Sequence, residues 1–577
     1  FTIFRTPKTK HFAMKKIIPH GQSNYKDLIL DNFYYVDRTM YIEKLEQVPN
    51  KYQFLLRPRK FGKSLFISML QYYYGIEHKE SFQDLFGDYY IGKNPTPLAN
   101  TFFVLTFNFS GIATYDEESV MGSFRNSVLS SLEDFNDTYK ILDNNEMSFI
   151  LGEKEPADVL LKYLRKISSR AERNIVILID EYDHFTNELL SFNLDLFKSS
   201  VASNGFVRKF FEVLKTFTGT GLVARLFATG VTPVTLDSLT SGFNIAVDLT
   251  LHPSMSEIMG FREEEVLQML AYYEVANQET TLLDMRRFYN GSKFSTDAEC
   301  GVYNSNMVWF FLYSILSTKK YPNPIIDKNI ASDYSKIGTI FSLNTSTETV
   351  NAINSIIYNG EVSAELTEQF TFQRDFSTND VISLLFYNGL LTVKSSELGN
   401  VIFTIPNYVI KELYWKFIAE RFAKQAEITV NTLELRTAVQ QMALEGKIDL
   451  YMAIINNTMK QLSNRDLQNF DEKYVKMLFM AFASLSPIYY KKSEYEVGKK
   501  YPDLMFLSTP VIPVENQMLF EFKYVKVSES HRLEEKIAES TAQIHGYLQL
   551  EEIKQIRNLH CYAIVFVGEV GHWRKIN

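Results

Sequence analysis

Residues 55–66 read LLRPRKFGKSLF and carry the residue types that bind phosphate. Gly62, Lys63 and Ser64 supply the end of the pattern G-x-x-x-x-G-K-[ST]. In that pattern backbone N–H groups and a helix N-terminus hold phosphate oxygens, the lysine neutralises charge and the hydroxyl holds Mg²⁺. Arg57 stands where the first glycine belongs, so a chance G-K-S at the start of a helix is the alternative interpretation.

Acidic residues that could complete such a site follow an apolar run at residues 175–183, IVILIDEYD. The run predicts a buried strand that places Asp180 at its C-terminal tip, followed by Glu181. In P-loop ATPases such an aspartate binds Mg²⁺ through water, and the next glutamate can orient the attacking water. A further strand ends near Thr229, whose hydroxyl could contact the γ-phosphate or cap the turn. The loop and the acids together predict an ATP site.

A second group of acids lies near the C-terminus, where DLMFLS and MLFEFKYV both predict strands joined through two prolines. A hairpin symmetric about residue 512 pairs Asp503 opposite Glu521, and strand alternation puts Glu521 and Lys523 on one face. Two adjacent carboxylates repel unless a cation lies between them, so this patch could hold Mg²⁺ or Mn²⁺. Such a metal activates water for attack on phosphate, with the lysine assisting. An exposed hairpin face with an ordinary cross-strand Lys–carboxylate arrangement is the alternative.

The elements that must position these residues alternate between strands and helices over the first 230 residues. This alternation predicts a parallel sheet covered by helices. Beyond residue 261 the pattern is mostly helical, and residues 378–422 read as helix, strand, strand and helix, which resembles a winged helix. DNA reading and simple packing between domains both remain open for that segment. The strands are expected at 52–56, 101–111, 175–183 and 224–230, with helices at 64–75 and 206–217.

Length and composition predict a multidomain globular protein. The chain has 577 residues, 46% of them hydrophobic and 22% charged, which is enough for three or four domains. A net charge of −8 argues against a protein that coats nucleic acid over its whole surface, but not against a local basic cleft. Cys300 and Cys561 form no disulfide framework or zinc-ligand set, so we expect a cytoplasmic location. No run reaches the roughly 18 apolar residues of a membrane span.

Several longer segments carry a family resemblance: RPRKFGKS, LIDEYD, ATGVT, SGFNIAVDLTLHPSMSEIMGFREEEV and FYNGSKF…VYNSNMVW. They closely resemble the AAA-ATPase-like proteins of bacteria, in which an AAA+-type P-loop domain is followed by a C-terminal PD-(D/E)XK nuclease-like domain. In that family the loop reads R-P-R-[RK]-F-G-K-S, so Arg57 is the family's form. Two segments depart from the family pattern: Ser292 replaces a tyrosine, and the strand end at residues 106–110 has a shifted register or a lost acid.

The resemblance implies site residues in both domains. Pro502-Asp503…Glu521-Phe522-Lys523 matches P-D…E-x-K, which suggests a catalytically competent nuclease domain. The nucleotide-binding residues are then Arg57, Pro58, Arg59, Lys60, Phe61, Gly62, Lys63, Ser64 and Thr229, and the catalytic residues are Glu181, Asp503, Glu521, Lys523, Glu472 and Gln543. Ser64 and Asp180, and separately Asp503 and Glu521, would hold metal. Gln543 either touches the site or belongs to the core. Arg208, Arg225 and Arg262 are candidates for an arginine finger, although a surface or structural role suits each better.

The expected fold is an α/β multidomain chain: a P-loop NTPase parallel sheet, a helical and winged-helix-like middle, and a C-terminal restriction-endonuclease-like α/β domain. Its parts are an N-terminal extension (1–24), an ATPase domain (25–260), a helical region (261–375), a winged-helix-like connector (376–465) and a nuclease-like domain (466–577).

The expected function is ATP binding and hydrolysis that gates a Mg²⁺- or Mn²⁺-dependent nuclease acting on DNA or RNA, with DNA favoured. A homo-oligomer is one expected assembly, and no membrane partner is expected. Lysines 491, 492, 499, 500 and 526 could contact phosphates. The alternative is a nucleotide-dependent switch whose nuclease-like domain binds nucleic acid or a partner without cleavage.

Overall fold

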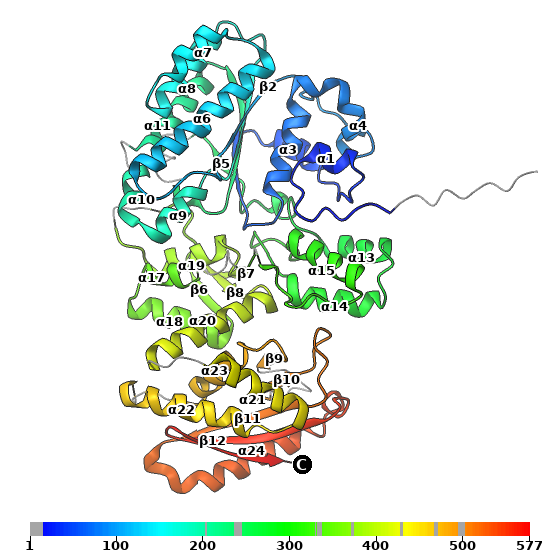
Figure 1. Cartoon of the computed structure of the whole chain (residues 1–577), viewed down its shortest axis with the longest axis vertical. Coiled ribbons are helices and arrows are strands. Elements are labelled where there is room, and N and C mark those ends of the chain that lie inside the picture. Colours follow the sequence, from blue (N-terminus) through cyan, green and yellow to red (C-terminus); the bar gives the residue numbers. More distant parts are fainter. Residues whose placement is uncertain are drawn as a thin grey trace, which may run out of the picture. The chain divides into compact units, whose positions relative to one another are not determined.

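The computed structural model describes residues 15–201, 205–235, 245–328, 330–331, 337–370, 374–426, 431–466, 471–493 and 502–576. Much of the expected N-terminal extension, together with Lys499 and Lys500, lies outside these ranges. The chain divides into two compact units (Figure 1). Unit 1 contains residues up to 319 with 366–376 and 386–396, and unit 2 contains 320–365, 377–385 and 397–577. Within the described residues, no helix combines the length and apolar character that crossing a bilayer requires.

The central sheet of unit 1 is parallel, as the alternation of strands and helices predicts. Its five strands have the order β2-β3-β4-β1-β5. Every residue of β3 is buried, which agrees with its continuous run of aliphatic side chains. The carboxyl ends of parallel strands meet at one edge, so the ends of β1, β3 and β4 lie together. The strands are β1 (Tyr52–Leu56), β2 (Phe103–Asn108), β3 (Ile175–Asp180), β4 (Val223–Gly230) and β5 (Val247–Asp248).

Helices cover this sheet on both sides (Figure 1). On one side α6 packs on β2 and on α8, and α8 packs on α11. A stack of phenylalanines fills the space beneath them, with Phe124 of α6 against Phe109 and Phe210. On the other side α3 packs on β3 and on α1. The bounds are α1 (Tyr25–Leu30), α2 (Met40–Gln47), α3 (Lys63–Tyr74), α4 (Phe82–Phe86), α5 (Tyr90–Lys93), α6 (Glu117–Tyr139), α7 (Asn144–Leu151), α8 (Pro156–Ile167), α9 (His184–Phe192), α10 (Leu194–Val201) and α11 (Phe206–Gly219).

The middle of the chain is mainly helical. Unit 1 continues through α13 (Glu263–Tyr272), α14 (Gln278–Tyr289) and α15 (Ser305–Thr318). The segment expected to resemble a winged helix has the anticipated order of elements: α19 (Thr378–Tyr387), β7 (Thr392–Glu397), β8 (Asn400–Thr404) and α20 (Tyr408–Ala426). In unit 2, β8 pairs antiparallel with β6 (Glu361–Ala364). The remaining helices are α17 (Ile337–Ser342), α18 (Thr347–Asn359), α21 (Thr432–Glu445) and α22 (Asp449–Asp466).

The C-terminal sheet of unit 2 has the order β13-β12-β11-β10-β9. Strands β11 and β12 are parallel, whereas the pairs β9–β10, β10–β11 and β12–β13 are antiparallel. Leu504 pairs with Phe520, which confirms the hairpin symmetric about residue 512. The elements are α23 (Glu472–Ala483), β9 (Tyr490–Ser493), β10 (Leu504–Leu507), β11 (Gln517–Val525), α24 (Leu533–Tyr547), α25 (Glu551–Lys554), β12 (Leu559–Val567) and β13 (Val570–Ile576).

Both faces of β11 are covered. Phe479 of α23 packs on Phe520 and Phe522, which point to one face. Ile544 of α24 lies in one apolar cluster with Leu519, which points to the other. The alternation expected from the sequence is therefore present, but neither face of the strand is open to solvent.

Candidate nucleotide and nuclease sites

The loop between β1 and α3 has the backbone of an anion-binding turn. Lys60 and Gly62 adopt left-handed conformations with φ of 67° and 106°. A Cβ on Gly62 would meet nothing within 4 Å, so the loop borders open space there. Among the described residues, none accepts a hydrogen bond from the N–H groups of Gly62, Lys63 or Ser64. These groups sit at the N-terminus of α3, where they can bind an anion.

Lys63 lies inside the curve of this loop. Its Nζ donates to the carbonyls of Arg57 (2.9 Å) and Pro58 (3.1 Å), and only 5% of the residue is exposed. Burial lowers the pKa of Lys63, whereas the carboxylates of Glu181 and Asp180 oppose that effect. The lysine and the two predicted acids are therefore close enough to interact electrostatically.

The end of β3 holds Asp180 beside Thr229 of β4. The Thr229 hydroxyl donates to Asp180 Oδ1 at 2.9 Å, and both residues are buried. No described residue donates to the other carboxylate oxygen of Asp180. Thr229 thus orients the acid rather than capping its own turn. Contact of Thr229 with a γ-phosphate stays a prediction.

Sequence reasoning gave no role to Asp183, the last acid of LIDEYD. It is fully buried and accepts hydrogen bonds from Thr232 N (2.6 Å), Val231 N (3.0 Å) and Asn187 Nδ2 (2.6 Å). These bonds tie the turn after β3 to the turn after β4. Its role is to set the edge of the sheet on which Asp180 and Thr229 meet. An acid three residues after the strand end was the only signal for this in the sequence.

Arg57 points into the protein. Its guanidinium donates to the carbonyls of Met255 (2.6 Å), Leu56 (2.7 Å) and Thr250 (3.0 Å), and it stacks on Phe294 at 4.1 Å. Its backbone N–H also donates to Gly230 O at 3.1 Å. The predicted contact of Arg57 with phosphate is therefore disfavoured, and the geometry supports a structural role instead. The residue that replaces the first glycine anchors the loop to residues 250–255.

The N-terminus of α15 also contacts the loop. Asn304 Nδ2 donates to Arg59 O (3.3 Å), and Ser305 Oγ donates to Phe61 O (3.2 Å). These bonds use loop carbonyls and leave the loop N–H groups available. The motif VYNSN, which carried part of the family resemblance, thus packs on the phosphate loop.

The three candidates for an arginine finger all have partners in their own chain. Arg208 Nε contacts Glu212 at 3.0 Å, Arg225 donates to Leu45 O at 3.2 Å, and Arg262 contacts Glu265 at 3.0 Å. Arg38 also donates to both carboxylate oxygens of Glu265, at 2.6 and 2.7 Å. These contacts support the structural role that we expected for each candidate.

The C-terminal hairpin brings Asp503, Glu521 and Lys523 together. Asp503 Oδ2 accepts from Phe522 N at 2.8 Å, directly beside Glu521. Lys523 Nζ donates to Glu521 Oε1 (3.2 Å) and to Phe522 O (2.9 Å). Glu521 is only 2% exposed. The alternative of an exposed hairpin face is therefore wrong, because α24 covers the face that carries Glu521.

Further side chains surround this patch. The predicted acid Glu472 approaches Lys523 Nζ at 3.8 Å. Lys476, one turn further along α23, approaches Asp503 Oδ1 at 3.5 Å, and Tyr547 of α24 donates to Glu521 Oε2 at 3.2 Å. Neither residue was found from the sequence. The available sequence signal for Tyr547 was its position four residues after Gln543, which places both residues on the same side of the helix.

Gln543 does not belong to the core, because it is exposed on α24. Among the described residues, no hydrogen bond joins Gln543 to the carboxylates of the hairpin. The structure therefore favours Tyr547 as the α24 residue that contacts them. Lys491, which was expected to contact phosphate, also has a different environment from the one predicted. It is buried and its Nζ lies 3.1 Å from Glu412 of α20.

The electrostatics of the patch favour a cation. Burial and the nearby Asp503 raise the pKa of Glu521 to about 7, and Lys523 only partly offsets this. Burial likewise raises the pKa of Glu472. A divalent cation between Asp503 and Glu521 would relieve their repulsion, so the donor set fits Mg²⁺ or Mn²⁺. Within the described ranges no group of three or more His, Cys, Asp and Glu side chains is arranged to hold a metal, so any ion there would rely on further ligands.

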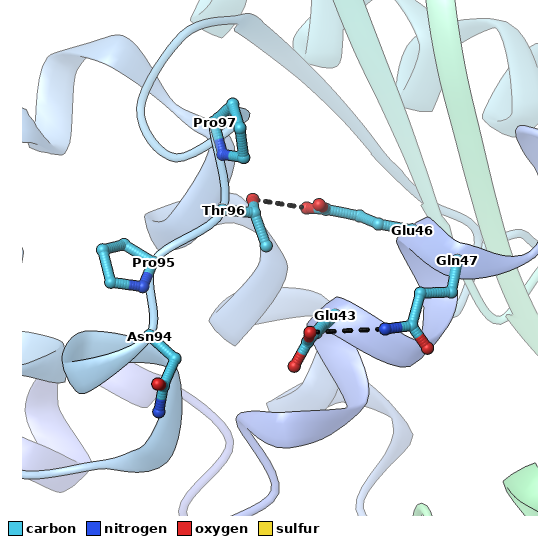
Figure 2. A pocket seen from close by; sticks show the side chains of 7 residues that line it. All are labelled: Glu43, Glu46, Gln47, Asn94, Pro95, Thr96 and Pro97. Atoms are coloured by element: carbon cyan, nitrogen blue, oxygen red, sulfur yellow. Dashed lines mark hydrogen bonds between the residues drawn. The ribbon is translucent and has the colours of Figure 1, made fainter.

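A separate pocket of about 430 Å³ lies between α2 and residues 94–97 (Figure 2). Its two acids already have donors. Glu46 accepts from Thr96 at 3.1 Å, and Glu43 accepts from Gln47 at 3.3 Å. The pocket is therefore assigned no ligand.

Comparisons with known proteins identify both domains. A family described as "Predicted AAA-ATPase" matches residues 19–240, and the "PD-(D/E)XK nuclease superfamily" matches residues 470–574. An uncharacterized protein of the vnfD 5′ region of Azotobacter chroococcum mcd 1 is 23% identical over 331 residues, which cover 52% of this chain and 56% of that relative. The chain thus spans about half the length of that relative.

Among solved structures, the Walker-type ATPase PABY2304 of Pyrococcus abyssi is similar with a TM-score of 0.36 and 11% identity, over 68% of this chain and 97% of that one. The parallel sheet with its phosphate loop agrees with the first family, and the five-stranded α/β domain agrees with the second. The chain combines a predicted AAA-ATPase domain at residues 19–240 with a PD-(D/E)XK nuclease superfamily domain at residues 470–574.

Proposed function

We propose that the protein binds and hydrolyses ATP at the loop of residues 57–64 and cleaves nucleic acid at the C-terminal hairpin. One observation carries the proposal: each domain gathers, in the geometry described above, the side chains that its chemistry requires. In unit 1, a lysine and two acids lie close enough to interact electrostatically, next to loop N–H groups that can bind an anion. Two carboxylates and a lysine meet on a covered strand in unit 2.

In the ATP site the chain's own residues would act on the phosphates. The N–H groups of Gly62, Lys63 and Ser64 donate to phosphate oxygens, and Lys63 exchanges its carbonyl partners for the β- and γ-phosphates. Ser64 and Asp180 would hold Mg²⁺, which would neutralise charge on the phosphates. Glu181 orients the attacking water.

In the nuclease site Asp503 and Glu521 would hold Mg²⁺ or Mn²⁺. A bound metal supplies a more acidic water and neutralises charge on the scissile phosphate. Lys523 keeps its ammonium beside Glu521, where it can orient that water and donate to a phosphate oxygen. Tyr547 holds the second oxygen of Glu521 in place.

Nucleotide state would gate cleavage, with DNA the favoured substrate over RNA. The test uses purified full-length protein with Mn²⁺ or Mg²⁺ and with DNA or RNA, each with and without ATP. Lys63→Ala and Glu181→Gln should lower ATP turnover by about 100-fold or more, since they remove charge stabilisation and water positioning. Asp503→Ala and Lys523→Ala should abolish cleavage and leave ATP turnover intact. Cleavage that persists in both nuclease variants refutes the nuclease assignment, and turnover indifferent to both loop variants refutes the ATPase assignment.

A second candidate function is a nucleotide-dependent switch that binds nucleic acid or a partner without cleaving it. The observation in its favour is that both oxygens of Glu521 already accept hydrogen bonds, from Lys523 and Tyr547. In the same assay, this function would appear as ATP-dependent retention of intact nucleic acid. Sedimentation with and without ATP would test the expected homo-oligomer.

A further inference from the structure

A cluster of four charged or titratable side chains adjoins the phosphate loop, and we name it the His184 cluster. Arg59 Nη2 of the loop lies 3.0 Å from His184 Nδ1 on α9. The same nitrogen lies 3.2 Å from Glu181 Oε2 at the end of β3. On the other side of the ring, Nε2 lies 3.5 Å from Glu188 Oε1. The imidazole therefore joins the element that would bind phosphate to the acid that would position water.

The chemistry of these groups makes two of the contacts mutually exclusive. A guanidinium only donates hydrogen bonds and an ionised carboxylate only accepts them, whereas Nδ1 of a neutral ring does one or the other. Without a proton, Nδ1 accepts from Arg59. With a proton, Nδ1 donates to Glu181. Nδ1 of His184 can thus accept a hydrogen bond from Arg59 or donate one to Glu181, but it cannot do both at once.

The backbone of Glu181 is also uncommon for a residue other than glycine. It adopts a left-handed conformation with φ of 51° directly after β3. Such conformations are costly for a non-glycine residue and gather at functional sites. The remaining partner of the cluster is anchored as well, because Thr114 Oγ1 donates to Glu188 Oε2 at 3.3 Å. The imidazole therefore lies between two carboxylates, of which Glu188 is anchored, and one arginine.

We propose that His184 is a positioning residue that couples occupancy of the phosphate loop to the placement of Glu181. When ATP binds, Arg59 leaves His184 for the γ-phosphate. Nδ1 then takes a proton from solvent water and donates to Glu181, while Nε2 keeps its proton toward Glu188. ADP lacks the γ-phosphate, so Arg59 remains on His184 and Glu181 is left without this donor. The inference rests on the proposed ATP hydrolysis and adds how the site distinguishes ATP from ADP.

Two variants of the full-length chain separate this role from simple packing. His184→Asn keeps an amide near the position of Nδ1, whereas His184→Gln places its amide near Nε2. His184→Gln should lower kcat for ATP by about 10- to 100-fold, the range for loss of one hydrogen bond to a charged group, with KM changed by less than about 3-fold. His184→Asn should retain kcat to within about 5-fold of the wild type. Equal losses in both variants, or a larger loss in His184→Asn, overturn the proposal.

A binding measurement keeps the failure of this inference distinct from failure of ATP hydrolysis. The ratio of affinities for a non-hydrolysable ATP analogue and ADP is measured by titration calorimetry. Arg59→Ala should reduce the preference for the ATP analogue by about 10-fold, because one charge-assisted contact to the γ-phosphate is lost. His184→Ala should raise that preference, because Arg59 no longer has to leave the imidazole. An unchanged ratio in both variants refutes the inference even if the wild type hydrolyses ATP. A wild type that binds but does not hydrolyse ATP refutes the hydrolysis alone.

Discussion

Replacing Glu521 by glutamine should remove a large pH dependence from the stability of the C-terminal domain. Burial and the nearby Asp503 raise the pKa of Glu521 from 4.5 to about 7. At 1.36 kcal/mol per pKa unit, this difference corresponds to about 3 kcal/mol. Because the folded-state pKa is the higher one, this contribution to stability is fully present below pH 4.5 and is lost as the pH rises through 7. Glutamine keeps the shape and the hydrogen bond from Tyr547 but has no charge to bury.

The assay is calorimetric unfolding of the full-length chain in EDTA from pH 5 to pH 8. The free energy of unfolding of Glu521→Gln minus that of the wild type should rise by about 2–3 kcal/mol from pH 5 to pH 8. This corresponds to a change on the order of 10 °C in the difference between their Tm values. Glu552→Gln is the matched control, because Glu552 is exposed on α25 of the same domain. Parallel pH profiles for wild type and Glu521→Gln would refute the reasoning. Mn²⁺ at pH 8 should stabilise the wild type more than the variant, since it pairs with the ionised carboxylate.

Three further substitutions test contacts that hold the sites. Tyr547→Phe should weaken Mn²⁺ binding about 10-fold, because Glu521 loses the hydrogen bond that orients one of its oxygens. The control Tyr489→Phe loses only a bond to a backbone carbonyl of the same domain and should bind Mn²⁺ like the wild type. Equal Mn²⁺ affinities of the two variants would contradict this. Arg57→Ala should lower stability by about 3 kcal/mol and abolish nucleotide binding, as measured by calorimetry, because three carbonyls lose their donor. Lys491→Ala should cost about 3–5 kcal/mol in urea unfolding, because Glu412, whose side chain is only 13% exposed, loses the buried ammonium that pairs with it. A cost below about 1 kcal/mol would contradict this.

Local patterns were sufficient for much of the fold. The strand at residues 52–56 and the helix that starts at the GKS sequence were predicted within one residue, because strand and helix signals act over a few positions. The register of Asp503 against Glu521 also followed from the sequence, since a hairpin's symmetry and the strand period of two are local properties. The burial of Glu521 did not follow, because it depends on α24, which lies beyond the hairpin in the chain.

The sequence by itself determined that this protein has a parallel sheet with a phosphate loop and a separate hairpin carrying two acids and a lysine. Residue type, period and turn residues are enough for such statements. Only the tertiary structure decided that Arg57 faces inward to the carbonyls of Thr250 and Met255, and that His184 meets Arg59 across 125 positions of the chain. Hydrogen-bond partners and desolvation depend on which distant segments pack together, and packing is a property of the whole domain.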